Sequence, residues 1–184
     1  MTEASVSKIG FRAELLRPAT PESVAWTFLR LPKEASERLP SRGMTSVEGT
    51  FNGVPFAATL DPDGQGGHWL KVQRDLREAA GAQVGDIVTL EVAPVTVEPE
   101  PKVPEDVQTA LAANPKAHAV WLDTTPLARR DWIHWITSGK KAETRTKRIE
   151  VTLSKLSAGK RRPCCFDRSG MYSNSLSCPL AADE

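Results

Sequence analysis

Residues 45–60 read TSVEGTFNGVPFAATL and predict two β-strands joined by a tight turn. The pair Asn52-Gly53 suits a two-residue type I′ turn, because both positions need a positive φ, which Asn tolerates and Gly adopts freely. Such a turn fixes the register of the two strands and places Thr45 opposite Leu60. One face of the ribbon is then almost entirely apolar, whereas the other carries hydroxyl groups and a glutamate. We therefore expect this hairpin to be scaffold, with its apolar face in a hydrophobic core.

Short stretches of alternating apolar and polar residues lie on both sides of the hairpin. They predict strands near residues 10–16, 24–31, 68–72 and 87–92. Residues 33–39 have little apolar face and predict one or two exposed helical turns, and residues 74–80 predict a short helix that ends at Gly81. Strands this short, without helical crossovers between most of them, favour an antiparallel barrel or sandwich over a parallel sheet.

The hydrophobic period changes after residues 95–103, a stretch rich in proline that predicts a stiff, extended linker. From Pro104 to Leu156 apolar residues recur at helical spacing and predict four helices. Asn114 is expected to cap the second helix and Thr125 to begin the third, since each precedes a proline suited to a first helical position. This part of the chain therefore forms a small helical module.

The composition predicts a soluble cytoplasmic protein. Lys and Arg number 24 against 23 for Asp and Glu, so the net charge indicates neither a nucleic-acid nor a membrane partner. The N-terminus lacks the apolar run of a signal peptide, and no segment approaches the ~20 apolar residues needed to span a bilayer. All three cysteines follow residue 163, so they form no disulfide framework for a core.

Motifs for metal, phosphate-loop or triad chemistry do not occur in the sequence. The three histidines are scattered, without a carboxylate or second histidine at metal-ligand spacing. The glycine run 63–67 lacks the Lys-Ser/Thr of a phosphate loop and predicts a turn. We expect no metal, no cofactor and no recognisable catalytic residues.

Several motifs carry a resemblance to known families. Four of them resemble a bacterial and archaeal domain of unknown function that forms a small β-barrel: residues 26–32, 47–53, 76–81 and 85–88. Three later motifs resemble the helical region of the bacteriocin-protection, YdeI/OmpD-associated family: residues 103–111, 132–136 and 140–149. Together the resemblance covers roughly residues 9 to 160.

The resemblance implies an α+β chain, in which a small antiparallel β-barrel of the double-split type precedes a C-terminal helical module. Such a barrel is similar to that of some transition-state regulators and antitoxins. The expected domains are a barrel over 8–94, the linker over 95–103, a helical module over 104–160 and a flexible tail over 161–184. The family supplies no catalytic residues to carry over.

The strongest candidate for ligand binding is the basic start of the last predicted helix. Lys141, Arg145 and Arg148 recur at i, i+4 and i+7, and Thr144 shares their face. Together with Lys140, they would gather cations and a hydroxyl at a helix N-terminus, which itself favours anions. We predict that this face binds phosphate, on a nucleic acid or on a small metabolite. The alternative is a solvated helix face without a ligand.

Two further sets of residues are candidates. Trp26, Arg30, His68 and Lys71 would line a ligand pocket if the barrel holds one. Cys164 and Cys165 lie near arginines that favour a thiolate, which predicts redox sensitivity; the alternative is a tail with incidental thiols.

The tryptophans of the third predicted helix also have two interpretations. Trp132 and Trp135 could stack on a flat ligand, but beside Ile133 and Ile136 they favour packing in a core, with His134 toward solvent.

Three functions of different classes stay open at this point. We expect first a non-catalytic intracellular binding or stress-protection protein, whose partner is a small anionic ligand or another protein. The second is a nucleic-acid-binding regulator that uses the barrel and the basic helix. The third is an enzyme on a small metabolite, working in the barrel interior or between the modules.

Overall fold

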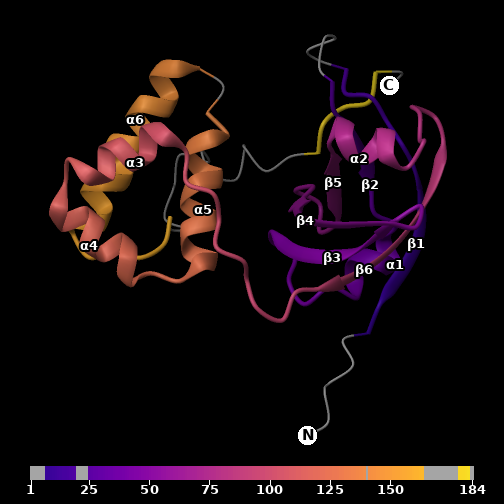
Figure 1. Ribbon diagram of the computed structural model, residues 1–184, viewed down its shortest axis with the longest axis horizontal. Coiled ribbons are helices and arrows are strands. Elements are labelled where there is room, and N and C mark those ends of the chain that lie inside the picture. The colour runs from indigo at the N-terminus through magenta and orange to yellow at the C-terminus, as the bar shows by residue number, and fades with distance from the viewer. Residues whose placement is uncertain (1–6, 20–24, 140, 164–177, 183–184) are drawn as a thin grey trace, which may run out of the picture. The chain divides into compact units, whose positions relative to one another are not determined.

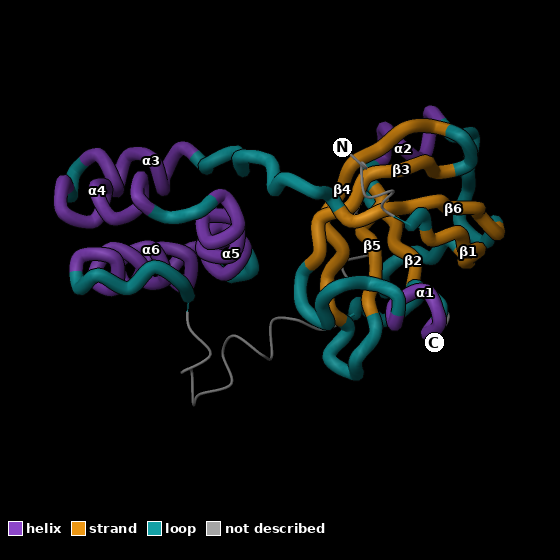
Figure 2. Tube along the Cα trace, turned by 90° about the horizontal axis from the view of Figure 1, so that it is seen from below, coloured by secondary structure: helices purple, strands orange, loops and turns teal. Residues whose placement is uncertain are grey.

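The computed structural model describes residues 7–19, 25–139, 141–163 and 178–182 (Figure 1). The described residues up to 96, together with 178–182, form one compact unit, and those from 97 to 163 form a second. The first unit is a β-barrel and the second is helical (Figure 2), so the predicted α+β class is confirmed.

The central hairpin forms as predicted. It consists of β3 (Thr45–Phe51) and β4 (Val54–Pro62), and Thr45 pairs with Leu60 in the expected register. Both turn residues have positive φ, 46° at Asn52 and 83° at Gly53, as a type I′ turn requires.

Six strands form one antiparallel sheet in the order β1-β6-β3-β4-β5-β2. The other four strands are β1 (Ile9–Glu14), β2 (Thr27–Arg30), β5 (His68–Val72) and β6 (Ile87–Pro94). Leu16, just beyond β1, forms a bridge with Phe28 of β2, so that the two edges of the sheet meet. Of the two predicted architectures, the nearly closed barrel is confirmed and the sandwich is wrong. Closure covers backbone groups that an open edge would expose.

Side chains from every strand fill the barrel interior. Phe51 and Leu60 of the hairpin, Leu15 and Val88 are all fully buried there. Helix α2 (Arg74–Ala79) ends as predicted before Gly81, whose φ is 63°. Helix α1 (Lys33–Glu37) differs from its prediction, because its turn buries Ala35 and the following Leu39 in the barrel core. These two apolar residues, four positions apart, are enough to pack so short a helix against the barrel core.

The second unit contains four helices, as predicted. They are α3 (Glu105–Ala112), α4 (Pro115–Asp123), α5 (Pro126–Thr137) and α6 (Ala142–Ser157). The predicted cap forms, since the Asn114 side chain accepts from the backbone N–H of Ala117 at 3.1 Å, and Thr125, predicted to begin the third helix, caps it by accepting from Ala128 at 3.2 Å. Each cap satisfies a backbone donor that the helix itself leaves unpaired.

The tryptophans of α5 belong to the core of the helical unit. Trp132 is fully buried and meets Trp135 edge to face, with ring centroids 6.2 Å apart. The core-packing interpretation is therefore confirmed. His134 is half-buried rather than turned to solvent.

Part of the proline-rich stretch before α3 is tied to α5. Glu98 pairs with Arg130 at 2.9 Å, and Glu100 pairs with Arg129 at 2.7 Å. We call these two ion pairs the acidic clasp. The division between the two units falls at residues 96 and 97, inside the stretch expected to be a linker.

Candidate functional site

The four residues predicted to line a pocket divide between the two sides of the barrel wall. Trp26, Arg30 and Lys71 lie on the outer side, where the Lys71 ammonium sits 4.7 Å from the centre of the Trp26 ring. His68 lies one strand position out of phase with Lys71, so its side chain points inward. The described interior is occupied by the hydrophobic core, and these four residues do not converge on one side of the wall.

His68 holds two loops instead of lining a pocket. Its backbone N–H donates to the Ser36 hydroxyl at 3.1 Å, and its ring Nε2 lies 3.0 Å from the carbonyl oxygen of Gly43. Because a carbonyl only accepts, Nε2 carries a proton and donates it to Gly43. The residue is only 1 % exposed, and its Nδ1 has no hydrogen-bond partner. His68 thus joins the end of α1 to the loop before β3.

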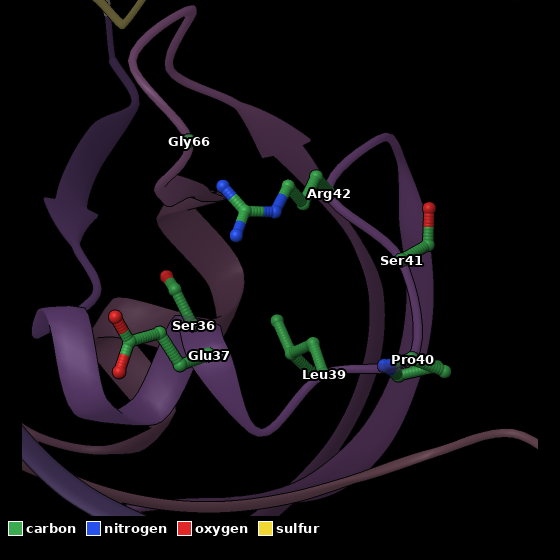
Figure 3. A pocket seen from close by; sticks show the side chains of 7 residues that line it. All are labelled: Ser36, Glu37, Leu39, Pro40, Ser41, Arg42 and Gly66. Carbon is green, nitrogen blue, oxygen red and sulfur yellow. The ribbon is translucent and has the colours of Figure 1, made fainter.

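A cleft of about 290 Å³ opens on the barrel surface beside these contacts (Figure 3). We call it the Arg42 cleft. Its lining comes from the end of α1, the following loop and the turn between β4 and β5: Ser36, Glu37, Leu39, Pro40, Ser41, Arg42 and Gly66. Figure 3 shows the Arg42 guanidinium reaching into the cleft, with the Ser36 hydroxyl and the Glu37 carboxylate on the opposite side.

The turn between β4 and β5 lies close to the Arg42 side chain. The Asp63 carboxylate accepts from the backbone N–H of Gln65 at 2.7 Å and of Gly67 at 2.8 Å, which closes the turn. Gly66 has a φ of 91°, and a Cβ there would lie 3.2 Å from the Arg42 guanidinium. Glycine at position 66 therefore serves both the backbone conformation and the approach of the arginine.

The Arg42 cleft offers an anion both charge and hydrogen-bond donors. Within the described part of the chain, Arg42 makes no ion pair, whereas Glu37 on the opposite wall has Lys33 at 3.8 Å. A guanidinium presents several donors in a fixed planar fork that fits carboxylate or phosphate oxygens. Sequence reasoning missed this site, because its residues come from loops without a motif; only the glycine run 63–67 marked a turn.

The predicted basic face of α6 is largely directed toward the protein. Arg145 binds Asp106 of α3 through two hydrogen bonds of 2.6 and 3.0 Å. Arg148 is 7 % exposed and donates to the Trp135 carbonyl at 2.5 Å and to the Ser138 hydroxyl at 2.8 Å. Thr144 lies close to Gly139, and Lys141 is exposed. Lys140 lies outside the described residues.

Two carboxyl groups of the helical unit have shifted pKa values. The hydrogen bond from Arg145 lowers the pKa of Asp106. Burial raises the pKa of Asp131, an effect that the neighbouring Arg130 opposes. Both shifts reflect contacts within the unit and do not indicate a ligand.

The remaining candidates add no site to the described structure. Cys164 and Cys165 lie outside the described residues. Over the ranges that are described, no cluster of three or more His, Cys, Asp or Glu side chains could hold a metal ion. None of the described helices has the length and apolar character needed to cross a bilayer.

Comparison with known families accounts for both units. Residues 11–92 match a domain of unknown function, DUF1905, and this range covers the barrel strands from β1 to β6. Residues 100–159 match the family described as bacteriocin-protection, YdeI or OmpD-associated, and this range covers α3 to α6. No curated protein matches the chain. The resemblance seen in the sequence motifs is thus confirmed: the barrel unit is similar to the DUF1905 domain, and the helices that follow are similar to the YdeI/OmpD-associated family.

Proposed function

We propose that this protein is a non-catalytic binding protein whose Arg42 cleft takes a small anionic ligand. The observation that carries the proposal is the Arg42 guanidinium, which lies in a formed cleft without an ion-pair partner among the described residues. An arginine held in this way supplies a charge-assisted contact that the protein itself has not satisfied.

The dimensions and walls of the cleft define the class of ligand. A cavity of about 290 Å³ lies at the lower end of the range that ligand pockets occupy, so it suits a small molecule. Arg42 favours a carboxylate or a phosphate group. Glu37 on the opposite wall favours a ligand that also carries a hydroxyl or an amine.

The surroundings of the cleft hold it in shape before a ligand arrives. His68 holds Ser36, which lines the cleft, and Gly43, the residue that follows Arg42, and Asp63 fixes the turn that carries Gly66. A site already arranged in its bound form loses less conformational freedom on binding. The matched family's name includes protection from bacteriocins, and we propose that sequestering a small anion is the route to such a role.

Calorimetric titration with three probes tests the proposal: inorganic phosphate, acetate and glycine. Replacing Arg42 by alanine should weaken binding about tenfold or more, because a hydrogen bond to a charged group contributes about 1.5–3 kcal/mol. Arg12→Ala is the matched control, since Arg12 is an exposed arginine on β1 far from the cleft in sequence and outside its lining.

The outcomes separate the parts of the proposal. Equal losses in Arg42→Ala and Arg12→Ala would show a general charge effect and no site at the cleft. Absence of binding by all three probes at millimolar concentration would overturn the proposal. Tighter binding of glycine than of acetate, lost in Glu37→Gln, would identify a ligand with an amino group.

A further inference from the structure

Ser36 lies near the end of α1 and brings a hydroxyl group to the Arg42 cleft. The residue is only 5 % exposed, and its oxygen accepts the backbone N–H of His68 at 3.1 Å. A serine hydroxyl carries a proton to donate as well as lone pairs that accept. Within the described part of the chain, no acceptor takes the proton of Ser36. The hydroxyl is therefore a buried donor that the fold leaves unsatisfied.

The local structure of α1 explains why this proton has no partner. A serine in a helix commonly donates to the carbonyl oxygen four residues earlier. For Ser36 this is the carbonyl of Pro32, which already accepts the backbone N–H groups of Ala35 at 3.0 Å and of Ser36 itself at 3.1 Å. A carbonyl oxygen has two lone pairs, so both are in use. A buried donor without an acceptor lowers stability, and a ligand that accepts its proton removes this cost.

The proton of Ser36 is directed toward the cleft. Ser36 lines the cleft, whereas His68, whose N–H occupies one lone pair of the Ser36 oxygen, does not. A hydroxyl turns its own proton away from an N–H that approaches its oxygen. Figure 3 shows the Ser36 oxygen and the Arg42 guanidinium on facing sides of the cleft. Two donors of different kinds, a planar fork and a single hydroxyl, thus face each other.

This arrangement of donors selects the shape of the anion. A guanidinium fork binds both oxygens of a carboxylate side by side. The carbon of the carboxylate then points away from Arg42, so a carboxylate turns its carbon chain toward Ser36. A phosphate group bound to the fork in the same way keeps a further oxygen, which points to the opposite wall. Only the tetrahedral group therefore supplies an acceptor to each donor.

We propose that the Arg42 cleft takes a phosphate group, and that Ser36 selects it over a carboxylate by donating its hydroxyl proton to a phosphate oxygen that Arg42 does not bind. The inference rests on the proposed function, since Arg42 supplies the first contact. It adds the class of the anion and a second recognition residue. The phosphate is either free or part of a small monoester, because both present the same oxygens to the two donors.

Calorimetric titration at pH 7 with inorganic phosphate, methyl phosphate and acetate tests the proposal. Ser36→Ala should weaken the binding of inorganic phosphate about tenfold, because it removes a hydrogen bond to a charged group, and that of acetate by no more than about twofold. Each probe is compared with itself, so the higher charge of phosphate cancels. Methyl phosphate that binds as tightly as inorganic phosphate identifies a monoester as the ligand, and much weaker binding identifies free phosphate.

Two further variants keep the outcome decisive. Thr45→Val is the matched control, since it also removes a buried hydroxyl, which donates to the Gly43 carbonyl at 3.2 Å and lies outside the cleft lining. It should leave the ratio of phosphate to acetate affinity unchanged. Ser36→Cys keeps a side chain of similar shape with only a weak S–H donor. It should lose most of the preference for phosphate even if Ser36→Ala fails to fold.

The outcomes separate this inference from the proposed function. Equal losses for phosphate and acetate in both Ser36 variants would overturn the inference, because Ser36 would then only support the wall of the cleft. Acetate binding as tight as phosphate in the unaltered protein would overturn it as well. In either case, weaker binding of every anion by Arg42→Ala would leave the proposed function intact. If none of the three probes binds at millimolar concentration, the proposed function fails and the inference fails with it.

Discussion

A buried basic side chain contacts a backbone carbonyl in each unit, His68 in the barrel and Arg148 in the helical unit, and the two differ in what surrounds them. In the barrel, His68 contacts the Gly43 carbonyl and lies behind a cleft into which Arg42 projects. In the helical unit, Arg148 contacts the Trp135 carbonyl, and its neighbour on α6, Arg145, binds Asp106. The two arginines of the basic cluster that is conspicuous in the sequence are thus engaged by the protein itself. Arg42 has no ion-pair partner among the described residues, so it can bind an anion without first losing such a partner.

The two units can be disrupted separately, and the largest effect is expected in the barrel. A Cβ at Gly49 would overlap the Glu91 carbonyl oxygen and lie 2.9 Å from the Val92 Cα. Gly49→Ala should therefore lower the free energy of unfolding by about 4 kcal/mol. This is more than overpacking usually costs, because the atoms in the way belong to the backbone of β6 and cannot rotate aside as a side chain can. Urea unfolding followed by circular dichroism measures it.

The control for this change is Gly10→Ala on β1. A Cβ at Gly10 comes no closer than 4.0 Å to the Leu90 carbonyl oxygen, so stability should stay within about 0.5 kcal/mol. Equal stability of the two variants would mean that β3 and β6 are less closely paired than the structure has them.

Arg148→Ala should destabilise the helical unit by about 3 kcal/mol, since it removes a buried charged donor and leaves the Trp135 carbonyl and the Ser138 hydroxyl without it. Thermal unfolding is the measurement. Lys147→Ala, an exposed change on the same helix, should stay within about 0.5 kcal/mol. If Arg148→Ala kept full stability but weakened phosphate binding, α6 would be a ligand-binding face and the contrast between the units would fail.

His68→Leu should cost about 2 kcal/mol, less than Arg148→Ala, because the His68 ring makes one hydrogen bond, to the Gly43 carbonyl, whereas Arg148 makes two from a charged group. The variant should in addition weaken phosphate binding several-fold by loosening the two walls of the Arg42 cleft. Arg42→Ala should cause a larger loss of phosphate affinity, while the free energy of unfolding changes by no more than about 0.5 kcal/mol. Urea unfolding and calorimetric titration of the same samples compare the two, and identical profiles would refute a positioning role for His68.

The smallest effect concerns the ion pair between α3 and α6. The pKa of Asp106 is lower in the folded state, so the pair stabilises fully above the unfolded pKa of about 3.9 and is lost as pH falls through the folded value. Both side chains are partly exposed, and solvent screening limits the contribution to about 0.5 kcal/mol. Asp106→Asn should remove this acid-side dependence in unfolding measured from pH 5 to pH 2. An unchanged pH profile would exclude the pair as its source.

Local rules predicted the scaffold from the sequence. The two-residue Asn52-Gly53 turn sets the register of the β3–β4 hairpin. Asn114 and Thr125 cap helices that begin at the next residue. In each case the interacting groups lie within a few positions of one another, so no tertiary information is needed.

The site depends on contacts that the sequence does not reveal. Ser36 and His68 are 32 residues apart, and Arg42 meets Gly66 only because two loops converge on one side of the barrel. Arg148 has the spacing of a surface cation, and its burial follows from where α5 ends in space, 10 residues before it at Ser138. The orientation of His68, by contrast, follows from the sequence alone. It lies three positions before Lys71 in one strand, so the two side chains point to opposite sides of the barrel wall.

The acidic clasp has a consequence for how the helical region can be exchanged between proteins. The family match begins at residue 100 and includes Glu100, but it leaves out Glu98, whose partner Arg130 is well shielded from solvent. A gene fusion that cut at Pro104 would carry α5 away without either carboxylate, leaving Arg130 with Asp131 and Arg129 with the carbonyls of Trp121 and Thr124. A fusion point between Thr96 and Val97 would transfer the helices together with Glu98 and Glu100, so the helical unit with its full set of ion pairs begins within a stretch that looks like a spacer.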